Sequence, residues 1–310
     1  MAKRTAKQST ESRTLAYFKN GIGNWVLMTP ALQALASMDA SGKIVLVSDS
    51  AWEDSRTQAF RDLWAATPWI ERVVWYPKET YKGEIARAFY SKHSEGGDAL
   101  TWFQNLDPNA GNQINWVGTL MHEHDYYMEI VRRLGYRGPV PAQFVPVAEG
   151  SVTLDQNIVL CNGAFGKMQT QKHWPHFDEL AKVLKLAYPK HQIISVGNGS
   201  ELRGCPVDVD HVGKLKITET ARVLRGAKLV ITTDTAVMHI ADALKCKTLA
   251  LFGGTIVSKN GPINGTTVIA RSYQRCQPCQ YTPLFESCAD ARCMRELSVG
   301  EVMGYVRNIL

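Results

Sequence analysis

Three polar residues at the start of a predicted helix could bind one anionic ligand. Residues 229–231 are a short apolar run typical of a buried parallel strand, and residues 236–244 have the apolar spacing of a helix. Asp234 and Thr235 stand where that helix must begin, and His239 lies one turn beyond Thr235. A helix N-terminus attracts anions, because its free N–H groups and its dipole point at the ligand. The alternative is that Asp234 and Thr235 only cap the helix and that His239 is a core histidine.

A glycine loop is expected near this helix start. The apolar residues 248–251 form the next predicted strand, which runs into Gly253, Gly254 and Thr255. The backbone at a glycine can approach a phosphate closely. The helix start and the glycine loop together predict a phosphate-binding site at the carboxyl edge of a parallel sheet.

Four of the seven cysteines lie close together near the C-terminus. Cys276 and Cys279 are separated by two residues, and Cys288 and Cys293 follow. Such a group predicts a four-thiolate metal site, with zinc first and an iron–sulfur cluster second. Any metal held there would be structural, because four thiolates leave no open position. The alternative is a set of reduced thiols packed in a loop.

Strands and helices must alternate to position these residues. Alternation of this kind predicts parallel sheets with helices on both faces. Strands are expected at residues 14–19, 43–48, 72–76, 99–103, 157–160, 192–196, 229–231 and 248–251. Helices are expected at residues 25–35, 54–66, 80–91, 122–134, after Pro175, and at 217–224, 236–244 and 299–310.

A chain of 310 residues is long enough for two domains. We expect a basic, disordered tail over residues 1–13 and a first domain over residues 14–138. Three prolines mark residues 139–150 as the linker to a second domain over residues 151–296, which includes the cysteines. Residues 297–310 form a last helix, expected to cross back to the first domain.

Composition and charge favour a protein of the cytoplasm. No apolar run approaches the length of a membrane helix, and the N-terminus lacks the apolar middle region of a signal peptide. The formal net charge is +6, of which +3 lies in residues 1–13. This tail is either a solvated leader or an arm that touches an anionic acceptor. Seven of the eight tryptophans lie in the first half, either as packing or as the lining of an acceptor cleft.

The stretch from Asp234 to Leu244, followed by residues 249–255, resembles the donor-site signature of glycosyltransferase family 9, the ADP-heptose:lipopolysaccharide heptosyltransferases. The family pattern is roughly Asp-Thr-Gly-x-x-His-x-Ala-x-Ala-Leu, then Phe-Gly-x-Thr. This chain departs from it at Ala236, where the family usually has glycine. A missing glycine could narrow the room for the donor or change which sugar nucleotide fits.

Residues 21–35 resemble a second signature of the family, Gly-Asp followed by a helix that contains Thr-Pro-x-Leu. The resemblance implies a general base at the aspartate, but the matching residue is Asn24, which has no useful basicity. Either another carboxylate acts, or little base assistance is needed, or the protein is a weak or inactive relative. Asp125 and His122, in a polar run that opens the helix at 122–134, are our candidates for the missing base; the alternative is a polar helix start.

Two further donor contacts follow from the resemblance. Lys172, in a Lys-x-Trp-Pro run, matches the family lysine that binds the donor diphosphate; the alternative is a surface lysine beside a helix start. Glu201, after the glycine turn at 197–199, matches an acidic residue that contacts the donor ribose. Some family members also carry a comparable Cys-x-x-Cys, Cys and Cys-Met pattern, without that saying what it binds.

The resemblance implies two facing, doubly wound (Rossmann-like) domains in the glycosyltransferase B arrangement. The second domain would bind a nucleotide-diphosphate sugar, and the first an acceptor, most simply a glycan of the lipopolysaccharide type. Transfer would invert the sugar carbon and use no catalytic metal, since Lys172 and the helix N-terminus at Thr235 and Ala236 would stabilise the leaving diphosphate. The alternatives are a nucleic-acid acceptor such as a hydroxymethylated base in DNA, or a sugar-nucleotide-binding protein without transferase activity.

Overall fold

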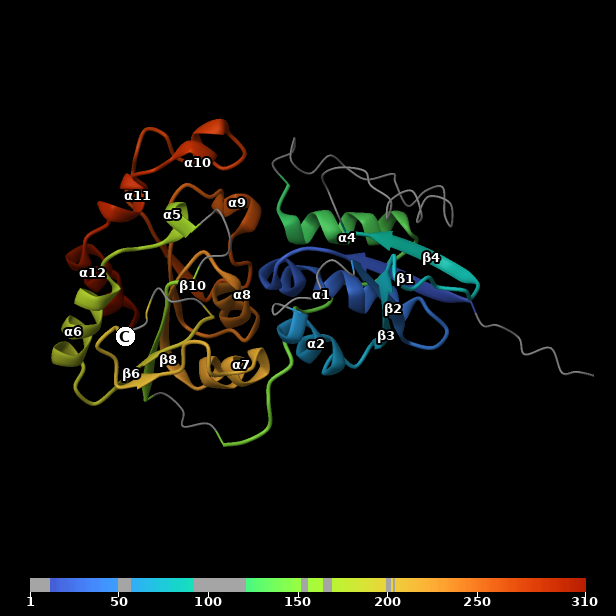
Figure 1. Ribbon diagram of the computed structural model, residues 1–310, viewed down its shortest axis with the longest axis horizontal. Coiled ribbons are helices and arrows are strands. Elements are labelled where there is room, and N and C mark those ends of the chain that lie inside the picture. Colours follow the sequence, from blue (N-terminus) through green and yellow to red (C-terminus); the bar gives the residue numbers. More distant parts are fainter. Residues whose placement is uncertain are drawn as a thin grey trace, which may run out of the picture.

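The computed structural model describes residues 12–49, 57–91, 121–151, 156–163, 169–198, 202 and 204–310. These residues form two α/β domains that lie side by side, each built on its own parallel sheet (Figure 1). Both sheets contain strands that were expected from apolar runs. Such runs predict strands because a strand that is covered on both faces is apolar along its whole length.

The first domain has a four-stranded sheet in the order β3-β2-β1-β4, in which every pair of neighbours is parallel. Its strands are β1 (Arg13–Phe18), β2 (Ile44–Asp49), β3 (Ile70–Tyr76) and β4 (Ile85–Tyr90). Its helices are α1 (Ile22–Ser37), α2 (Thr57–Ala65) and α4 (Glu123–Arg133). Apolar side chains of β1, α1 and α4 meet in one core, in which Trp25 and Trp64 are almost fully buried. These two tryptophans therefore pack the domain rather than line a cleft.

The prediction of a helix at residues 80–91 is wrong, because residues 85–90 form strand β4. This segment pairs in parallel with β1 along its length, and the Tyr90 ring stacks on Tyr17 with centroids 4.7 Å apart. Its alanines and arginine favour a helix locally, but pairing at the edge of the sheet overrides that preference. The strand expected at residues 99–103 lies outside the described residues.

The second domain has a six-stranded sheet in the order β10-β9-β8-β5-β6-β7, again parallel throughout. Its strands are β5 (Asn157–Cys161), β6 (Gln192–Ser195), β7 (Val209–Asp210), β8 (Ala227–Thr233), β9 (Thr248–Leu251) and β10 (Thr267–Ala270). Its helices are α5 (Gln169–Lys172), α6 (Phe177–Ala187), α7 (Ile217–Arg225), α8 (Ala236–Ala243), α9 (Val257–Asn260), α10 (Pro283–Ser287), α11 (Arg292–Arg295) and α12 (Val299–Ile309).

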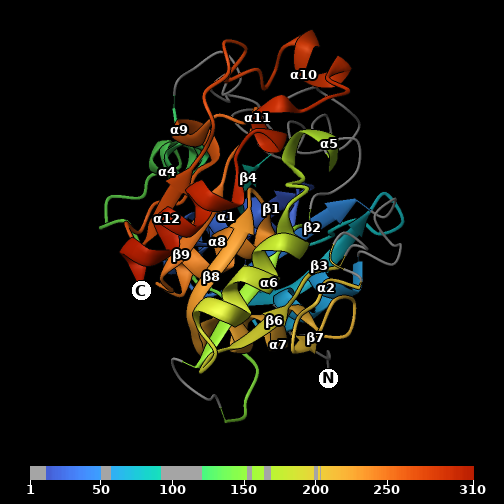
Figure 2. The same cartoon turned by 90° about the vertical axis from the view of Figure 1, so that its left-hand side faces the viewer.

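We expected the last helix, α12, to cross back to the first domain, but it packs on the second domain. Its apolar residues Val299, Val302, Met303 and Val306 join the core of the second domain. In Figure 2, α6 and α12 both lie in front of the strands of the second sheet. A short helix with one apolar face packs on the nearest open surface, which here belongs to its own domain.

The two domains meet mainly through α1, which packs against α8 (Figure 1). The connecting segment is fastened to both domains. The Phe144 N–H donates to the Thr29 hydroxyl on α1 at 2.9 Å, and the Ala148 N–H donates to the Thr218 carbonyl on α7 at 3.0 Å. The connecting segment therefore ties α1 of the first domain to α7 of the second.

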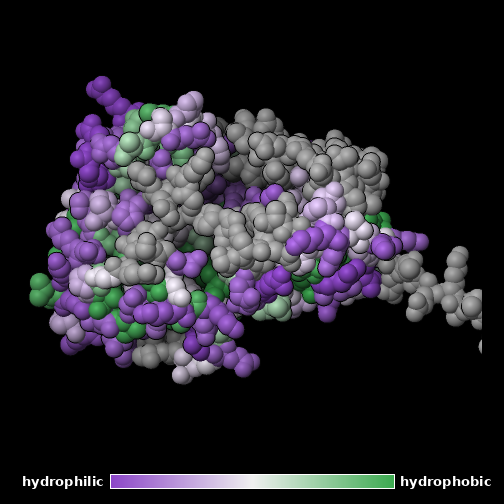
Figure 3. Space-filling view, in the orientation of Figure 1, coloured by the Kyte–Doolittle hydropathy of each residue, from purple (hydrophilic) through white to green (hydrophobic). Residues whose placement is uncertain are grey.

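On the face shown in Figure 3, hydrophilic residues are mixed with smaller hydrophobic spots over the described surface of both domains. Within the described part of the chain, no helix combines the length and apolar character that a membrane span requires.

Candidate active site at the domain junction

The start of α8 is not capped by the side chain of its N-cap residue. Thr235 is the N-cap residue and has an extended backbone, but its side chain makes no capping hydrogen bond. Its hydroxyl lies 3.2 Å from that of Thr232 instead. Ala236 is the first residue of the helix, at the position where glycine is usual in the resembling family. The interpretation of Asp234 and Thr235 as a mere helix cap is therefore not supported.

Asp234 is the centre on which the other expected donor residues converge. Its carboxylate pairs with the Lys172 ammonium at 2.9 Å. Burial acts to raise the pKa of Asp234, but Lys172, His239 and the Thr255 hydroxyl lower it, and the net pKa lies below the ordinary value. Asp234 is therefore ionised at neutral pH although it is buried, with only 5% of its surface exposed.

Lys172 is positioned by Trp174, which lies two residues further along the chain. Trp174 is fully buried, and its backbone exchanges two hydrogen bonds with the Asn162 side chain, at 2.8 and 3.0 Å. Asn162 follows β5 directly, so this clamp fixes the Lys-x-Trp-Pro segment at the carboxyl edge of the second sheet. The ring N–H of Trp174 donates to the Leu297 carbonyl at 2.8 Å and locks the other side.

His239 is buried and lies against the first domain. Burial lowers its pKa to about 4, although the charge of Asp234 acts to raise it, so the imidazole is neutral at pH 7. A β-carbon added to Gly23 on α1 would lie only 2.6 Å from the His239 Cδ2 atom. The absence of a side chain at Gly23 thus allows α1 to approach α8 closely.

The glycine loop after β9 is braced by the segment from Cys276 to Cys293, which we call the cysteine segment. The Gly254 carbonyl accepts from the backbone N–H groups of Cys279 and Gln280, both at 3.0 Å. The Gly253 carbonyl accepts from the Gln277 amide at 2.8 Å. A β-carbon on Gly253 would lie 2.5 Å from the Gln171 carbonyl, directly before Lys172. These glycines pack the loop against its supports, and the Thr255 hydroxyl that follows them lies close enough to Asp234 to lower the pKa of its carboxyl group.

Asn24 lies on the first turn of α1 and holds a carboxylate that sequence reasoning missed. Its side-chain amide donates to Glu123 Oε1 at 2.6 Å, and its own oxygen accepts from the Gly21 N–H at 3.0 Å. Glu123 is fully buried at the first position of α4. A readable signal did exist, because Glu123, Tyr127 and Ile130 share the apolar face of a helix at spacings of four and three.

The two candidates proposed for the missing base, His122 and Asp125, lie beside Glu123 at the start of α4. Asp125 is exposed on the first turn of α4. His122 has both ring nitrogens engaged: Nδ1 accepts from the His124 N–H at 3.1 Å, and Nε2 lies 3.0 Å from the Gly261 carbonyl, which requires a donor. Burial lowers the pKa of His122, so it is a neutral, fully bonded N-cap. Glu201, the expected ribose contact, lies outside the described residues.

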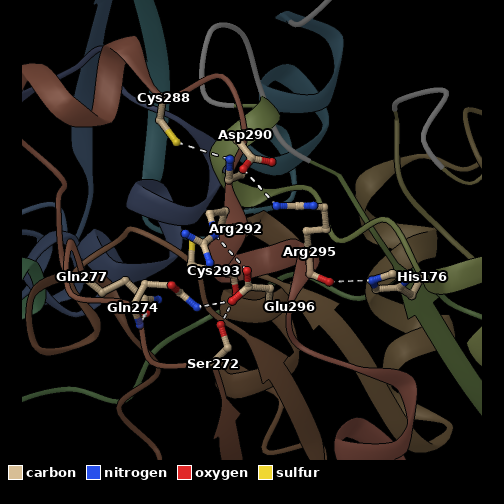
Figure 4. A network of polar contacts seen from close by, with 11 residues as sticks. His176, Ser272, Gln274, Gln277, Cys288, Asp290, Arg292, Cys293, Arg295 and Glu296 are labelled. Atoms are coloured by element: carbon tan, nitrogen blue, oxygen red, sulfur yellow. Dashed lines mark hydrogen bonds and ion pairs between the residues drawn. The ribbon is translucent and has the colours of Figure 1, made fainter.

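The four cysteines gather beside the glycine loop. Burial, together with the neighbouring thiols of Cys279, Cys276 and Cys288, raises the pKa of Cys293 to about 11, so the other three cysteines lie within electrostatic reach of Cys293. Figure 4 shows Cys288 at one end of a polar network and Cys293 within it; in this network Arg292 pairs with Glu296 at 2.8 Å. Among the residues that the structure describes, no three His, Cys, Asp or Glu side chains are placed to hold a metal ion.

Comparison with known proteins relates part of this chain to a family and the whole chain to solved structures. Residues 142–289 match the family model of glycosyltransferase family 9 (heptosyltransferase). A comparison with curated protein sequences finds no match. Among solved structures, the chain is similar to a family 9 glycosyltransferase from Veillonella parvula DSM 2008, with 14% identity and a TM-score of 0.69 over 96% of this chain and 97% of that chain.

Two Escherichia coli structures are also similar. Heptosyltransferase WaaC, solved with ADP, has 16% identity and a TM-score of 0.67 over 96% of this chain and 100% of that chain. The iron-containing dodecameric glycosyltransferase TibC has 14% identity and a TM-score of 0.68 over 96% of this chain and 79% of that chain. At such identities these structures establish the fold, and the glycosyltransferase B arrangement expected from the sequence is confirmed.

Proposed function

We propose that this chain, whose residues 142–289 match the model of glycosyltransferase family 9, is a nucleotide-sugar glycosyltransferase that carries a sugar from a nucleoside diphosphate to an acceptor hydroxyl at the junction of α1 and α8. The observation that carries this proposal is the convergence of Lys172, His239 and Thr255 on Asp234 at the uncapped start of α8. The donor lies in the second domain and the acceptor enters from the first. The acceptor is a glycan of the lipopolysaccharide type.

The mechanism follows from the charge that develops on the leaving group. When the sugar–phosphate bond breaks, negative charge builds on the diphosphate. The Lys172 ammonium and the N–H groups of the first turn of α8 stabilise this charge without a metal ion. Asp234 orients Lys172 through the 2.9 Å ion pair. A single displacement by the acceptor oxygen inverts the configuration at the sugar carbon.

Donor binding tests this proposal directly. Purified protein is titrated with ADP-, UDP-, GDP- and CDP-linked sugars, and thermal stabilisation is measured. We expect ADP-heptose to stabilise the protein, since the similar WaaC structure holds ADP. The Lys172→Ala/Asp234→Ala variant should lose this stabilisation. It removes both partners, so no buried charge is left unpaired.

A matched ion pair in the same domain provides the control. Lys185 pairs with Asp208 at 2.7 Å on the surface, away from the start of α8. The Lys185→Ala/Asp208→Ala variant should keep the full response to the donor. Equal donor stabilisation in both double variants would contradict the assignment of the donor site.

Transfer is then measured with the donor that binds. Lipopolysaccharide core oligosaccharide is compared with DNA that contains hydroxymethylated bases. Transfer to the oligosaccharide supports the proposed acceptor, whereas transfer to DNA alone would replace it with the nucleic-acid alternative. Donor binding without transfer or release of the nucleotide would make the chain a binding protein.

The cysteine segment would serve this site as a structural support. Its described thiols are neighbours but do not form a ligand set, so a bound zinc or iron would have to draw Cys276, Cys279, Cys288 and Cys293 together. Iron is tested beside zinc because TibC is described as iron-containing. Metal analysis of the purified protein should give about one zinc or iron per chain, and less in Cys276→Ser/Cys279→Ser. Absence of both metals would leave the reduced thiols as packing.

A further inference from the structure

A buried carboxylate without a cation lies at the domain junction. Glu123 Oε1 accepts from the Asn24 amide at 2.6 Å and from the Tyr127 hydroxyl, and Oε2 accepts from the Asn260 amide at 3.1 Å. Among the described residues none forms an ion pair with Glu123. An ionised carboxylate in a protein interior is costly without a cation, and such groups are concentrated at functional sites.

We propose that Glu123 is the general base of the transfer reaction and takes the part that Asn24 cannot perform. The inference rests on the proposed function, since a base is needed only if an acceptor hydroxyl attacks a sugar. Asn24 then acts as a positioning residue. The family motif has an aspartate at the position of Asn24. Here the Asn24 amide instead donates a hydrogen bond to the Glu123 carboxylate and so fixes its position.

The surroundings of Glu123 suit a base. Burial raises its pKa above the ordinary value, although the hydrogen bonds from Tyr127 and Asn24 act to lower it. A carboxylate with a raised pKa holds a transferred proton better than an exposed one. The titratable groups around it are His122, Tyr126 and Tyr127 on its own helix and Tyr281 in the cysteine segment.

The donor site and Glu123 belong to one junction. Gly23, the neighbour of Asn24, lies against His239 of the donor helix. Tyr281 lies within electrostatic reach of both Glu123 and Asp234, so one side chain is close to the base and to the donor residues. An acceptor placed between the domains can therefore meet the base and the sugar together.

The Asn260 amide marks the place of the acceptor hydroxyl. Asn260 belongs to α9 of the second domain, and its 3.1 Å hydrogen bond is longer than the 2.6 Å bond from Asn24. The adjacent contact from His122 to the Gly261 carbonyl also joins the two domains. A small separation of α9 from α4 breaks both contacts and frees Oε2 for the O–H of an acceptor.

The proposed step is balanced. The acceptor oxygen forms a bond to the anomeric carbon while its proton passes to Glu123 Oε2. The bond from that carbon to the diphosphate oxygen breaks, and its electron pair stays on the diphosphate beside Lys172. Glu123 returns the proton to water after the products leave.

The test moves the carboxylate from position 123 to its hydrogen-bond partner at position 24. Glu123→Gln removes the base, whereas Asn24→Asp/Glu123→Gln exchanges acid and amide between the two positions. Turnover is measured as the nucleoside diphosphate released from ADP-heptose, with core oligosaccharide or water as the acceptor. We expect Glu123→Gln to lower kcat by about 10²- to 10⁴-fold with an unchanged donor dissociation constant. The kcat of the exchanged pair should be at least about tenfold higher than that of Glu123→Gln, because Asn24→Asp supplies a base at the family position.

The pH profile separates a base from a structural group. Wild type should lose activity as the pH falls through the pKa of Glu123, and Glu123→Gln should lack this acid limb. Glu129→Gln, on the same helix but at the surface, is the control and should keep wild-type turnover. If Glu123→Gln does not fold, Glu123→Asp keeps the charge and tests the same profile.

Two results would overturn the assignment. One is a Glu123→Gln variant that binds donor and keeps turnover within about threefold of wild type, less than general base catalysis contributes. The other is wild-type protein that binds donor but releases no diphosphate with either acceptor. Failure of wild type to bind any donor would instead refute the proposed function, so the two failures are distinguishable.

Discussion

Replacing Asn24 with aspartate would appear from the sequence to restore the family base, but the structure predicts the opposite. The Asn24 amide is 2.6 Å from Glu123 Oε1, so Asn24→Asp sets two carboxyl groups against each other in a buried site. We expect the single variant to be less stable than wild type at neutral pH and no more active. The exchanged pair avoids this conflict, because Glu123→Gln supplies an amide donor.

The size of the effect can be worked out by two routes. Two unit charges about 4 Å apart repel by about 4 kcal/mol at the effective dielectric constant of a protein. Alternatively, the pair keeps one shared proton that an aspartate of ordinary pKa, about 3.9, would lose in the unfolded chain. That proton costs about 1.36 kcal/mol for each pH unit above 3.9, or about 4 kcal/mol at pH 7. Both routes give the same loss at neutral pH.

The pH dependence has a definite sign. The folded pair binds one proton more than the unfolded chain between pH 4 and pH 7, so the variant loses stability relative to wild type as the pH rises. The loss should be about 1.5 kcal/mol at pH 5 and about 4 kcal/mol at pH 7.

Urea denaturation of wild type and variant at these two pH values measures the difference. Gln58→Glu is the matched control, since the Gln58 amide donates to Asp62 at 2.8 Å on the surface, where the same exchange should cost a few tenths of a kcal/mol. A loss for Asn24→Asp that is below about 1 kcal/mol at pH 7, or that is independent of pH, would refute the reasoning.

Three further predictions concern the donor side. Gly23→Ala should lower the free energy of unfolding by about 1–3 kcal/mol, because its β-carbon would lie 2.6 Å from His239, whereas Gly304→Ala on α12 should be neutral or stabilising; equal denaturation midpoints would contradict this. Burial holds the pKa of His239 at about 4 against about 6.5 unfolded, so stability is lost as the pH falls from 6.5 to 4, by at most about 3 kcal/mol, and His239→Asn should flatten a thermal melting series over that range. Gly253→Ala would bring a β-carbon 2.5 Å from the Gln171 carbonyl and displace Lys172, so calorimetric donor affinity should fall at least about tenfold; unchanged affinity would show that the loop does not position the lysine.

Much of the arrangement around Asp234, the proposed donor site, could be predicted because its signals are local. The apolar runs of β8 and β9 determine where two buried strands end, and parallel strands end at one edge. Asp234 and Thr255 follow those ends directly, and Lys172 is tied to the end of β5 through Trp174. The convergence on Asp234 is thus a consequence of order along the chain and of strand direction.

Tertiary structure alone decided what depends on packing between distant segments. Residues 85–90 became a strand because β1 offered them an open edge, and α12 stayed with the second domain because its apolar face fits the core there. Asn24 and Glu123 are separated by 99 residues, and their hydrogen bond exists because α1 and α4 pack side by side. Sequence marks which residues can do chemistry, but burial and the partners of a carboxylate are set by the packing of distant helices, which no local pattern encodes.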